Sequence, residues 1–435
     1  MRFLGVGDYC DLGALYLRLQ AEGHEVKVSI SDPLCHDVLS GMLTRVADWR
    51  AELAWVKSAG EDGVIVFENV AEQRGAVQDD LRAQGFNVIG GSAFGDRLET
   101  DRAYGQRVLA ELGLNVAPVH EFSGYDAAAR HIDDNPGRYV LKFNDPEFEA
   151  ADNYVGFAPD GADTKAVLRA KLAQTKIPKA DFILMPWIDG VEIGVGAYFD
   201  GEKFMGRACL DWEHKHFFPG DMGELTGEMG TIVTYDRTET FFERTLAKMQ
   251  PLLREHKYVG YINLNTIVNE QGIWPLEFTC RFGYPGFAIL TPLQETPWGA
   301  LFKAMICRRG EFKTRAGFCA GIVMTTPPFP HSRHYVTSPA GMPVFTETTR
   351  ADEPHLHLAE VAMKGGQMVT AGAFGWIMVV TGTGGTIAEA QQAALRRAAK
   401  VRTANLRYRT DIGAKLIAGD FTKVERLGLL DPPER

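Results

Sequence analysis

Residues able to do chemistry alternate along one short stretch, 275–284, which reads PLEFTCRFGY. From Glu277 onward every second residue is polar or charged: Glu277, Thr279 and Arg281. The residues between them are apolar. Because successive side chains of a strand point to opposite faces, the stretch predicts a strand with one core face. The other face carries a carboxylate, a hydroxyl and a guanidinium.

The preceding stretch, YINLNTIV, predicts a partner strand joined to the first by a hairpin loop at 270–272, whose glycine takes the left-handed conformation. In that register Asn265 faces Glu277 and Asn263 faces Thr279, so amide oxygens join the polar face. Hard oxygen ligands with few protein charges suit Mg²⁺, which usually also binds substrate phosphates. An adjacent guanidinium suits phosphoryl oxygens. A solvated sheet face with a Glu–Arg pair is the alternative interpretation.

Composition limits the classes of protein that fit. The chain has 435 residues, which predicts about three domains. Its formal charge of −10 argues against nucleic acid or an anionic membrane as the main partner. The six cysteines form no CxxC pair, which disfavours a zinc site and a disulfide framework. With no long apolar run and no signal-peptide pattern, we expect a cytoplasmic protein that does not bind membranes.

The elements that must position these residues fall into three regions. Short strands alternate with helical segments over 1–95, which predicts a doubly wound α/β domain. A second unit is expected over 96–317. It is rich in strands and is interrupted by one amphipathic helix, TETFFERTLAKMQPLLREH. The remainder, 318–435, has its own strands and a helix and is predicted to form a C-terminal domain.

At this point the sequence resembles a known family. YVGYINLNTIVNEQGIWPLEFTCRFGYP is similar to the metal-binding strands of ATP-grasp ligases, and within them to the phosphoribosylamine–glycine ligases. EHKHFFPGDMGELTGEMGT resembles the family's glycine-rich loop, and GGQMVTAGAFGWIMVVTGTGGTIAEAQQAA resembles its C-terminal domain. The resemblance implies a Rossmann-like pre-ATP-grasp domain, an ATP-grasp domain with a mobile lid at roughly 118–185, and a small β-rich C-terminal domain.

The resemblance also implies roles for individual residues. Glu277 matches the principal Mg²⁺ (or Mn²⁺) ligand, with Thr279 and Asn265 as weaker oxygen ligands. Arg281 matches the arginine that steadies the transferring phosphoryl group, and Lys215 lies in the substrate-closing loop. The residues expected to bind ATP are two cations for its phosphates, two hinge residues whose backbone holds adenine, and one carboxylate for the ribose hydroxyls: Arg102 and Lys142, Met185 and Trp187, and Glu192.

The family's substrate motifs are less well kept than its nucleotide motifs. GVGDYCDLGA stands where the family has Gly-Gly-Arg-Glu-His-Ala, and Tyr284-Pro285-Gly286 replaces Asp-Pro-Glu. Glu228 replaces a glycine of Thr-Gly-Gly-Met-Gly, and the acidic NDPEFEAADNYVG replaces a glycine-rich lid segment. The resemblance therefore predicts the reaction type and leaves both substrates open.

Three hypotheses follow. The first is an ATP-dependent carboxylate–amine ligase that forms an acyl phosphate and then an amide, acting on glycine and phosphoribosylamine or on a related amino acid and amine. The second is the same chemistry in a modified-nucleotide or natural-product pathway. The third, motivated by Thr279 and Asn265, is a nucleotide-binding protein without catalysis. In each case we expect small-molecule partners and a monomer or homodimer.

Overall fold

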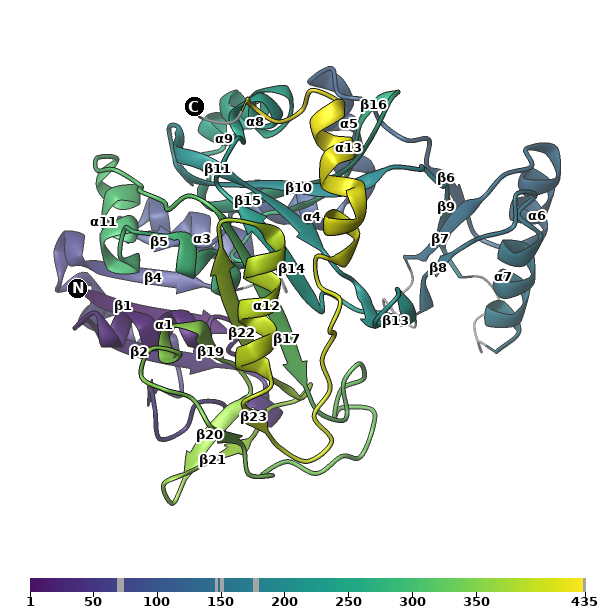
Figure 1. The fold of residues 1–435 in the computed structure, drawn as a ribbon. Helices are drawn as coiled ribbons and strands as arrows, with labels where there is room; N and C mark the ends of the chain where they lie inside the picture. Colours follow the sequence, from purple (N-terminus) through teal and green to yellow (C-terminus); the bar gives the residue numbers. More distant parts are fainter. Residues whose placement is uncertain (69–73, 145–147, 149–151, 175–179, 433–435) are drawn as a thin grey trace.

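The computed structural model describes residues 1–68, 74–144, 148, 152–174 and 180–432. Three sheets dominate it, with five, eight and four strands (Figure 1). Parts of the acidic NDPEFEAADNYVG segment lie outside the described residues. In the part of the chain that is described, no helix combines the length and apolar character needed to cross a membrane.

The N-terminal sheet is parallel and has the strand order β3-β2-β1-β4-β5. Alternate residues of its strands pack into two different hydrophobic clusters, with Phe3 and Val28 on one face and Leu4, Val6 and Ile65 on the other. Both faces are therefore covered, as a doubly wound sheet requires. The elements are β1 (Arg2–Gly7), α1 (Gly13–Ala21), β2 (Glu25–Ile30), β3 (Thr44–Arg45), α2 (Leu53–Lys57), β4 (Gly63–Phe67), α3 (Arg74–Ala83) and β5 (Val88–Ile89).

The large sheet is antiparallel, in the order β16-β15-β10-β11-β14-β17-β22-β19. Two helices that precede the lid, α4 (Ala93–Thr100) and α5 (Arg102–Glu111), pack on β16. The Asp101 side chain caps α5 by accepting a hydrogen bond from the Tyr104 N–H. The central elements are β10 (Val191–Asp200), β11 (Phe204–Glu213), β12 (His216–Phe218), β13 (Met222–Leu225), β14 (Gly230–Thr234), α8 (Glu239–Arg244), α9 (Gln250–Glu255), β15 (Val259–Asn269), β16 (Gly272–Thr279), α10 (Gly286–Leu290) and α11 (Trp298–Cys307).

A small unit stands apart from the rest of the molecule and is joined to it by two segments of chain (Figure 1). Its sheet has the order β6-β9-β7-β8, and its helices pack on that sheet around a separate core that includes Ile132, Leu141 and Leu168. A core of its own allows this unit to move as a body. It covers most of the lid expected at 118–185. Its elements are β6 (His120–Phe122), α6 (Tyr125–Asp134), β7 (Tyr139–Phe143), β8 (Tyr154–Val155), α7 (Ala162–Gln174) and β9 (Phe182–Pro186).

The C-terminal region continues the large sheet, because β17 pairs with β14 and α12 packs along β22 and β17 (Figure 1). A boundary at 317/318 would thus cut a continuous sheet, and the division into 1–95, 96–317 and 318–435 stays a proposal. The elements are β17 (Phe318–Thr325), β18 (Phe345–Thr346), β19 (Leu356–Leu358), β20 (Val361–Lys364), β21 (Gln367–Thr370), β22 (Trp376–Gly384), α12 (Ile387–Ala398), β23 (Val401–Arg402) and α13 (Phe421–Arg426).

Two local predictions were wrong. The hairpin turn is one residue shorter than 270–272, because Asn269 pairs directly with Gly272, and an irregularity near Leu276 restores the predicted register further along. The single helix expected over TETFFERTLAKMQPLLREH is divided into α8, a 3-10 turn and α9. Thr245 leaves the helical conformation (φ −129°, ψ −97°) at the division, and its hydroxyl bonds back to the Phe241 carbonyl.

Candidate active site

A cavity of about 310 Å³ opens on the polar face of the β15–β16 hairpin. Its wall includes Asn263 and Asn265 from β15, and Glu277 and Thr279 from β16. Asn265 lies opposite Glu277, and Asn263 lies opposite Thr279. The register predicted from the alternation of polar residues is therefore confirmed at the positions that matter for the site.

Glu277 is surrounded by positive charge from three separate segments. Its two carboxylate oxygens lie 3.3 Å from Lys215 Nζ and 3.3 Å from Arg102 Nη2. The Lys215 ammonium lowers the pKa of Glu277 to about 2, with further help from Lys142 and Arg102 and against the effect of burial. Glu277 is thus a firmly ionised carboxylate at neutral pH.

Lys215 is the centre of this charge cluster. Its Nζ lies 3.0 Å from Glu192, 3.3 Å from Glu213 and 3.3 Å from Glu277. Burial alone would lower the pKa of Lys215, but the three carboxylates together hold that pKa well above its usual range. One ammonium therefore pairs with three carboxylates, which come from β10, β11 and β16.

Lys142 reaches the same cluster from strand β7 of the lid. Burial lowers the pKa of Lys142 to about 8, and the neighbouring cations Arg102 and Lys215 act in the same direction, while Glu277 and Glu192 oppose them. Added negative charge near this lysine would stabilise its protonated form. That is the property expected of a phosphate-binding cation.

Glu192, predicted to take ribose hydroxyls, lies beside the metal candidates. It accepts a hydrogen bond from Asn265 Nδ2 at 2.6 Å and pairs with Lys215. Burial raises the pKa of Glu192, but these two partners outweigh it and the net shift is downward. The ribose role remains a prediction.

The hinge candidates lie at the end of β9, within the lid. Met185 is buried and pairs with Val140 of β7. The backbone N–H of Trp187 already donates to the Arg138 carbonyl at 2.9 Å, and the Arg138 guanidinium lies over the Trp187 ring at 3.6 Å. Adenine binding through these two residues stays a prediction, and it could not use the N–H of Trp187 without breaking that bond.

Arg281 lines the cavity but belongs to a different group of charges. Its Nε donates to Glu99 of helix α4 at 3.0 Å. Burial lowers the pKa of Arg281, and Glu99 and Asp11 more than offset this and raise it. The structure therefore brings Arg281 into the cavity wall without placing it against Glu277, and its role toward a phosphoryl group remains a prediction.

The metal candidates Glu277, Thr279 and Asn265 share the cavity wall. A carboxylate, a hydroxyl and an amide offer the hard oxygens that Mg²⁺ and Mn²⁺ accept. Among the described residues, no group of three or more His, Cys, Asp or Glu side chains could hold a metal by itself. These protein oxygens thus fit a cation whose other ligands come from a bound molecule, such as the phosphates of a nucleotide.

Sequence reasoning missed several carboxylates of this cavity. Asp211 and Glu213 stand two residues apart on β11, and Glu228 follows β13. Burial and the nearby Glu213 raise the pKa of Asp211 to about 8, and burial and the other two acids raise that of Glu228. The alternation in CLDWEHK could have pointed to Asp211 and Glu213, since Cys209 lines the same cavity.

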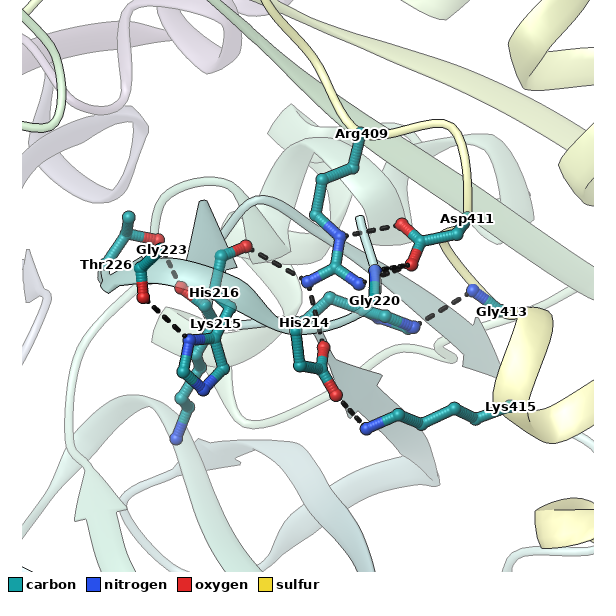
Figure 2. Close-up of polar contacts among 11 residues, drawn as sticks. His214, Lys215, His216, Gly220, Gly223, Thr226, Arg409, Asp411, Gly413 and Lys415 are labelled. Carbon is teal, nitrogen blue, oxygen red and sulfur yellow. Dashed lines mark hydrogen bonds and ion pairs between the residues drawn. The ribbon is translucent and has the colours of Figure 1, made fainter. Parts of the chain in front are cut away.

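A C-terminal segment clasps the loop that carries Lys215, as Figure 2 shows. Arg409 is only 1% exposed. It donates to Asp411 through two nitrogens, at 2.8 and 2.7 Å, to Asp221 Oδ1 at 3.0 Å and to the His216 carbonyl at 3.0 Å. A buried guanidinium with all these acceptors fixes the loop in place.

Two backbone amides strengthen this clasp (Figure 2). Gly220 N–H donates to Asp411 Oδ2 at 2.8 Å, and Gly413 N–H donates to His214 Nε2 at 3.0 Å. Burial lowers the pKa of His214 to about 4, with a smaller contribution from Arg409. His214 is therefore neutral at pH 7 and can accept the Gly413 hydrogen bond.

Replacing Arg409 with alanine is expected to lower the free energy of unfolding by roughly 3 kcal/mol, because the partly buried carboxylates of Asp221 and Asp411 lose a buried partner. The matched control is Lys415→Ala, which removes the exposed cation that shares Asp221 and should cost less than about 1 kcal/mol. Denaturant unfolding of both variants measures the difference. Equal losses would contradict a buried clasp.

Comparisons with known proteins agree with this geometry. Residues 100–287 match the family model described as phosphoribosylglycinamide synthetase, ATP-grasp (A) domain. The phosphoribosylamine–glycine ligase of Pseudomonas aeruginosa is 25% identical over 396 residues, which cover 88% of this chain and 87% of that protein. The corresponding ligase of Nostoc sp. is 27% identical over 388 residues, covering 85% and 88%.

A solved structure shows the same fold. The crystal structure of phosphoribosylamine–glycine ligase from Thermotoga maritima superposes with a TM-score of 0.70 at 20% identity, and covers 95% of this chain and 100% of that one. The expected combination of a parallel N-terminal sheet with antiparallel central and C-terminal sheets is thereby confirmed. The chain is an ATP-grasp protein related to the phosphoribosylamine–glycine ligases over most of its length.

Proposed function

We propose that the protein is an ATP-dependent ligase that joins the carboxylate of an amino acid to an amine. The observation that carries the proposal is the surroundings of Glu277, an ionised carboxylate enclosed by Lys142, Lys215 and Arg102 from three segments. Such an arrangement suits a triphosphate that arrives with a divalent cation.

The proposed reaction has two steps. A carboxylate oxygen of the amino acid attacks the γ-phosphorus of ATP, and ADP leaves with the electrons of the broken P–O bond. The amine nitrogen then attacks the acyl carbon of the resulting acyl phosphate, phosphate leaves, and the amine loses a proton. The products are an amide, ADP and phosphate.

The protein's part in this reaction is positioning and charge. Lys142 and Arg102 would hold the phosphates, and Glu277 with Asn265 and Thr279 would hold the cation, which supplies further neutralisation of phosphoryl charge. Because Lys142 belongs to the lid, its attraction to the phosphates would draw the lid toward the cavity and exclude water that hydrolyses an acyl phosphate. Arg281 lines the same cavity and would steady the transferring phosphoryl group.

The affinity for ATP is expected to fall as the pH rises through about 8, the pKa to which burial lowers Lys142. The protonated lysine binds phosphate, and the neutral amine that forms above this pH does not. KM for ATP measured from pH 6.5 to 9.5 checks this. Lys142→Arg should move the rise in KM to higher pH, since arginine stays protonated. An unchanged profile in that variant would exclude Lys142 as the titrating group.

ADP release tests the function. Purified protein with ATP and Mg²⁺ is screened against amino acids and amines in pairs, with glycine plus phosphoribosylamine tried first. ADP formed only when both an amino acid and an amine are present supports the ligase. ATP binding without ADP formation across the whole panel would instead favour a nucleotide-binding protein.

A further inference from the structure

The cavity has an unusual charge balance. Five carboxyl side chains and two cations line it among the described residues: Glu99, Asp211, Glu213, Glu228 and Glu277 against Lys215 and Arg281. We infer that the amine substrate of the proposed ligase is a small polycationic amine without phosphate, such as an aliphatic diamine, held by Asp211 and Glu228. The inference rests on the proposed function for the acylation step and concerns only the identity of the acceptor.

Neither cation of the cavity wall is available to an anionic substrate. Arg281 is bound to Glu99 at 3.0 Å. Lys215 is shared by three carboxylates, all within 3.3 Å. A phosphorylated amine would have to displace one of these ion pairs, whereas an ammonium group would meet carboxylates directly.

Asp211 shows the need for a positive donor most clearly. It is 6% exposed. Its Oδ2 accepts a hydrogen bond from Asn263 Nδ2 at 2.6 Å, and its Oδ1 is buried without a partner. A desolvated carboxylate oxygen that lacks a donor is costly to keep. Burial raises the pKa of Asp211, and an ammonium group in the adjoining cavity would favour its ionised form through charge.

Glu228 places a second acid in the same cavity. One of its oxygens accepts a hydrogen bond from the Thr231 hydroxyl. Its charge interacts unfavourably with those of Asp211 and Glu213. Because Lys215 already serves Glu192, Glu213 and Glu277, a single ammonium cannot offset all of the remaining charge. Two ammonium groups on one ligand would match Asp211 and Glu228 on binding. One of them then gives a proton to the carboxylate that it faces, and the neutral amine so formed is the nucleophile.

The remaining wall of the cavity suits the methylene chain of such an amine. Tyr284 lines the cavity. Its ring stacks on Trp376, with centroids 5.0 Å apart, and Trp376 stacks on Phe374 at 4.7 Å. Aromatic faces attract organic cations and repel anions. A volume of about 310 Å³ is enough for a short diamine.

The test compares three acceptors in the ADP-release assay, each with the amino-acid panel: 1,4-diaminobutane, 1-aminobutane and phosphoribosylamine. We expect kcat/KM for the diamine to exceed that for the monoamine by at least about ten-fold, since only the diamine reaches both carboxylates. Glu228→Gln should raise KM for the diamine about ten-fold and leave KM for ATP unchanged. The matched control is Glu243→Gln, an exposed glutamate on α8.

Turnover of phosphoribosylamine but not of the diamine would overturn the inference and leave the ligase proposal intact. Equal use of the diamine and the monoamine would also overturn it. Calorimetric titration with 1,4-diaminobutane gives a readout that needs no turnover, and Asp211→Asn should weaken the binding about ten-fold. Binding without any ADP formation would retain the cation site and reject the ligase. Absence of both would reject the two proposals together.

Discussion

Glu277→Ala is expected to lower the rate of ATP turnover by about a thousand-fold or more. The variant removes the carboxylate that faces Asn265 on the neighbouring strand and that three cations surround. Folding should survive. Lys215 keeps Glu192 and Glu213 as partners, and Arg102 is partly exposed. A change of about 1 kcal/mol in the free energy of unfolding is therefore expected.

ADP release measures the turnover of this variant, and thermal unfolding measures its stability. Glu243→Ala serves as the control because this glutamate is exposed on α8, away from the cavity. A second variant, Glu277→Gln, keeps the size of the side chain and removes its charge. If either Glu277 variant retains more than a tenth of the wild-type rate, the assignment of Glu277 as the metal ligand is wrong.

The polar face of the hairpin could be predicted because its information is local. A period of two fixes which side chains share a face, and a short connection fixes which residues lie opposite each other. The loop prediction was wrong by one residue, yet Asn265 still faces Glu277 because the irregularity near Leu276 compensates. The core face imposes this compensation, since a slip of one residue would turn Glu277 into the core.

The partners of the predicted residues could not be found in the same way. Arg281 pairs with Glu99, which lies 182 residues earlier in the chain, and Arg102 pairs with Glu277, 175 residues later. No periodicity within a single segment reports such distances. The contacts of Arg409 with the Lys215 loop could not be predicted for the same reason, since they join segments that are 188 to 193 residues apart in the chain. Only the tertiary fold brings these charges together.

The break between α8 and α9 could not be predicted from the hydrophobic pattern of the segment. The segment is amphipathic and therefore predicts one helix, but the Thr245 hydroxyl offers the Phe241 carbonyl a local hydrogen bond. Pro251 starts the next helical segment, at a position where it needs no backbone donor. Leu246 and Met249, between the two helices, are fully buried. Core packing thus decides a geometry that the hydrophobic pattern alone leaves undetermined.

Lys215→Met should reduce both turnover and stability, which distinguishes it from Glu277→Ala. Methionine keeps the length of the side chain and removes the charge shared by Glu192, Glu213 and Glu277. Three carboxylates are then left to repel one another. The free energy of unfolding should fall by roughly 3 kcal/mol at pH 7, the low end for a broken buried pair, because these side chains are a quarter to a third exposed.

The loss should depend on pH in a defined direction. The pKa of Lys215 is raised, so its contribution is fully present below its ordinary value of 10.5 and is lost only as the pH rises further. The pKa of Glu277 is lowered to about 2, so its contribution is present above its ordinary 4.5 and is lost as the pH falls toward 2. The pair therefore stabilises the wild type between about pH 4.5 and 10.5, and the variant should approach the wild type in acid.

Denaturant unfolding of both proteins at pH 7 and at about pH 2 measures this convergence. Lys313→Met is the control, because it removes an exposed lysine paired with the exposed Glu311 and should leave the free energy of unfolding nearly unchanged at either pH. A loss of the same size at about pH 2 and at pH 7 would mean that Lys215 acts through packing and not through charge. A loss of stability confined to the higher pH would mean that Lys215 acts through its charge. The ion pairs of Lys215 with Glu192, Glu213 and Glu277 would then be what connects β10, β11 and β16 at the wall of the cavity.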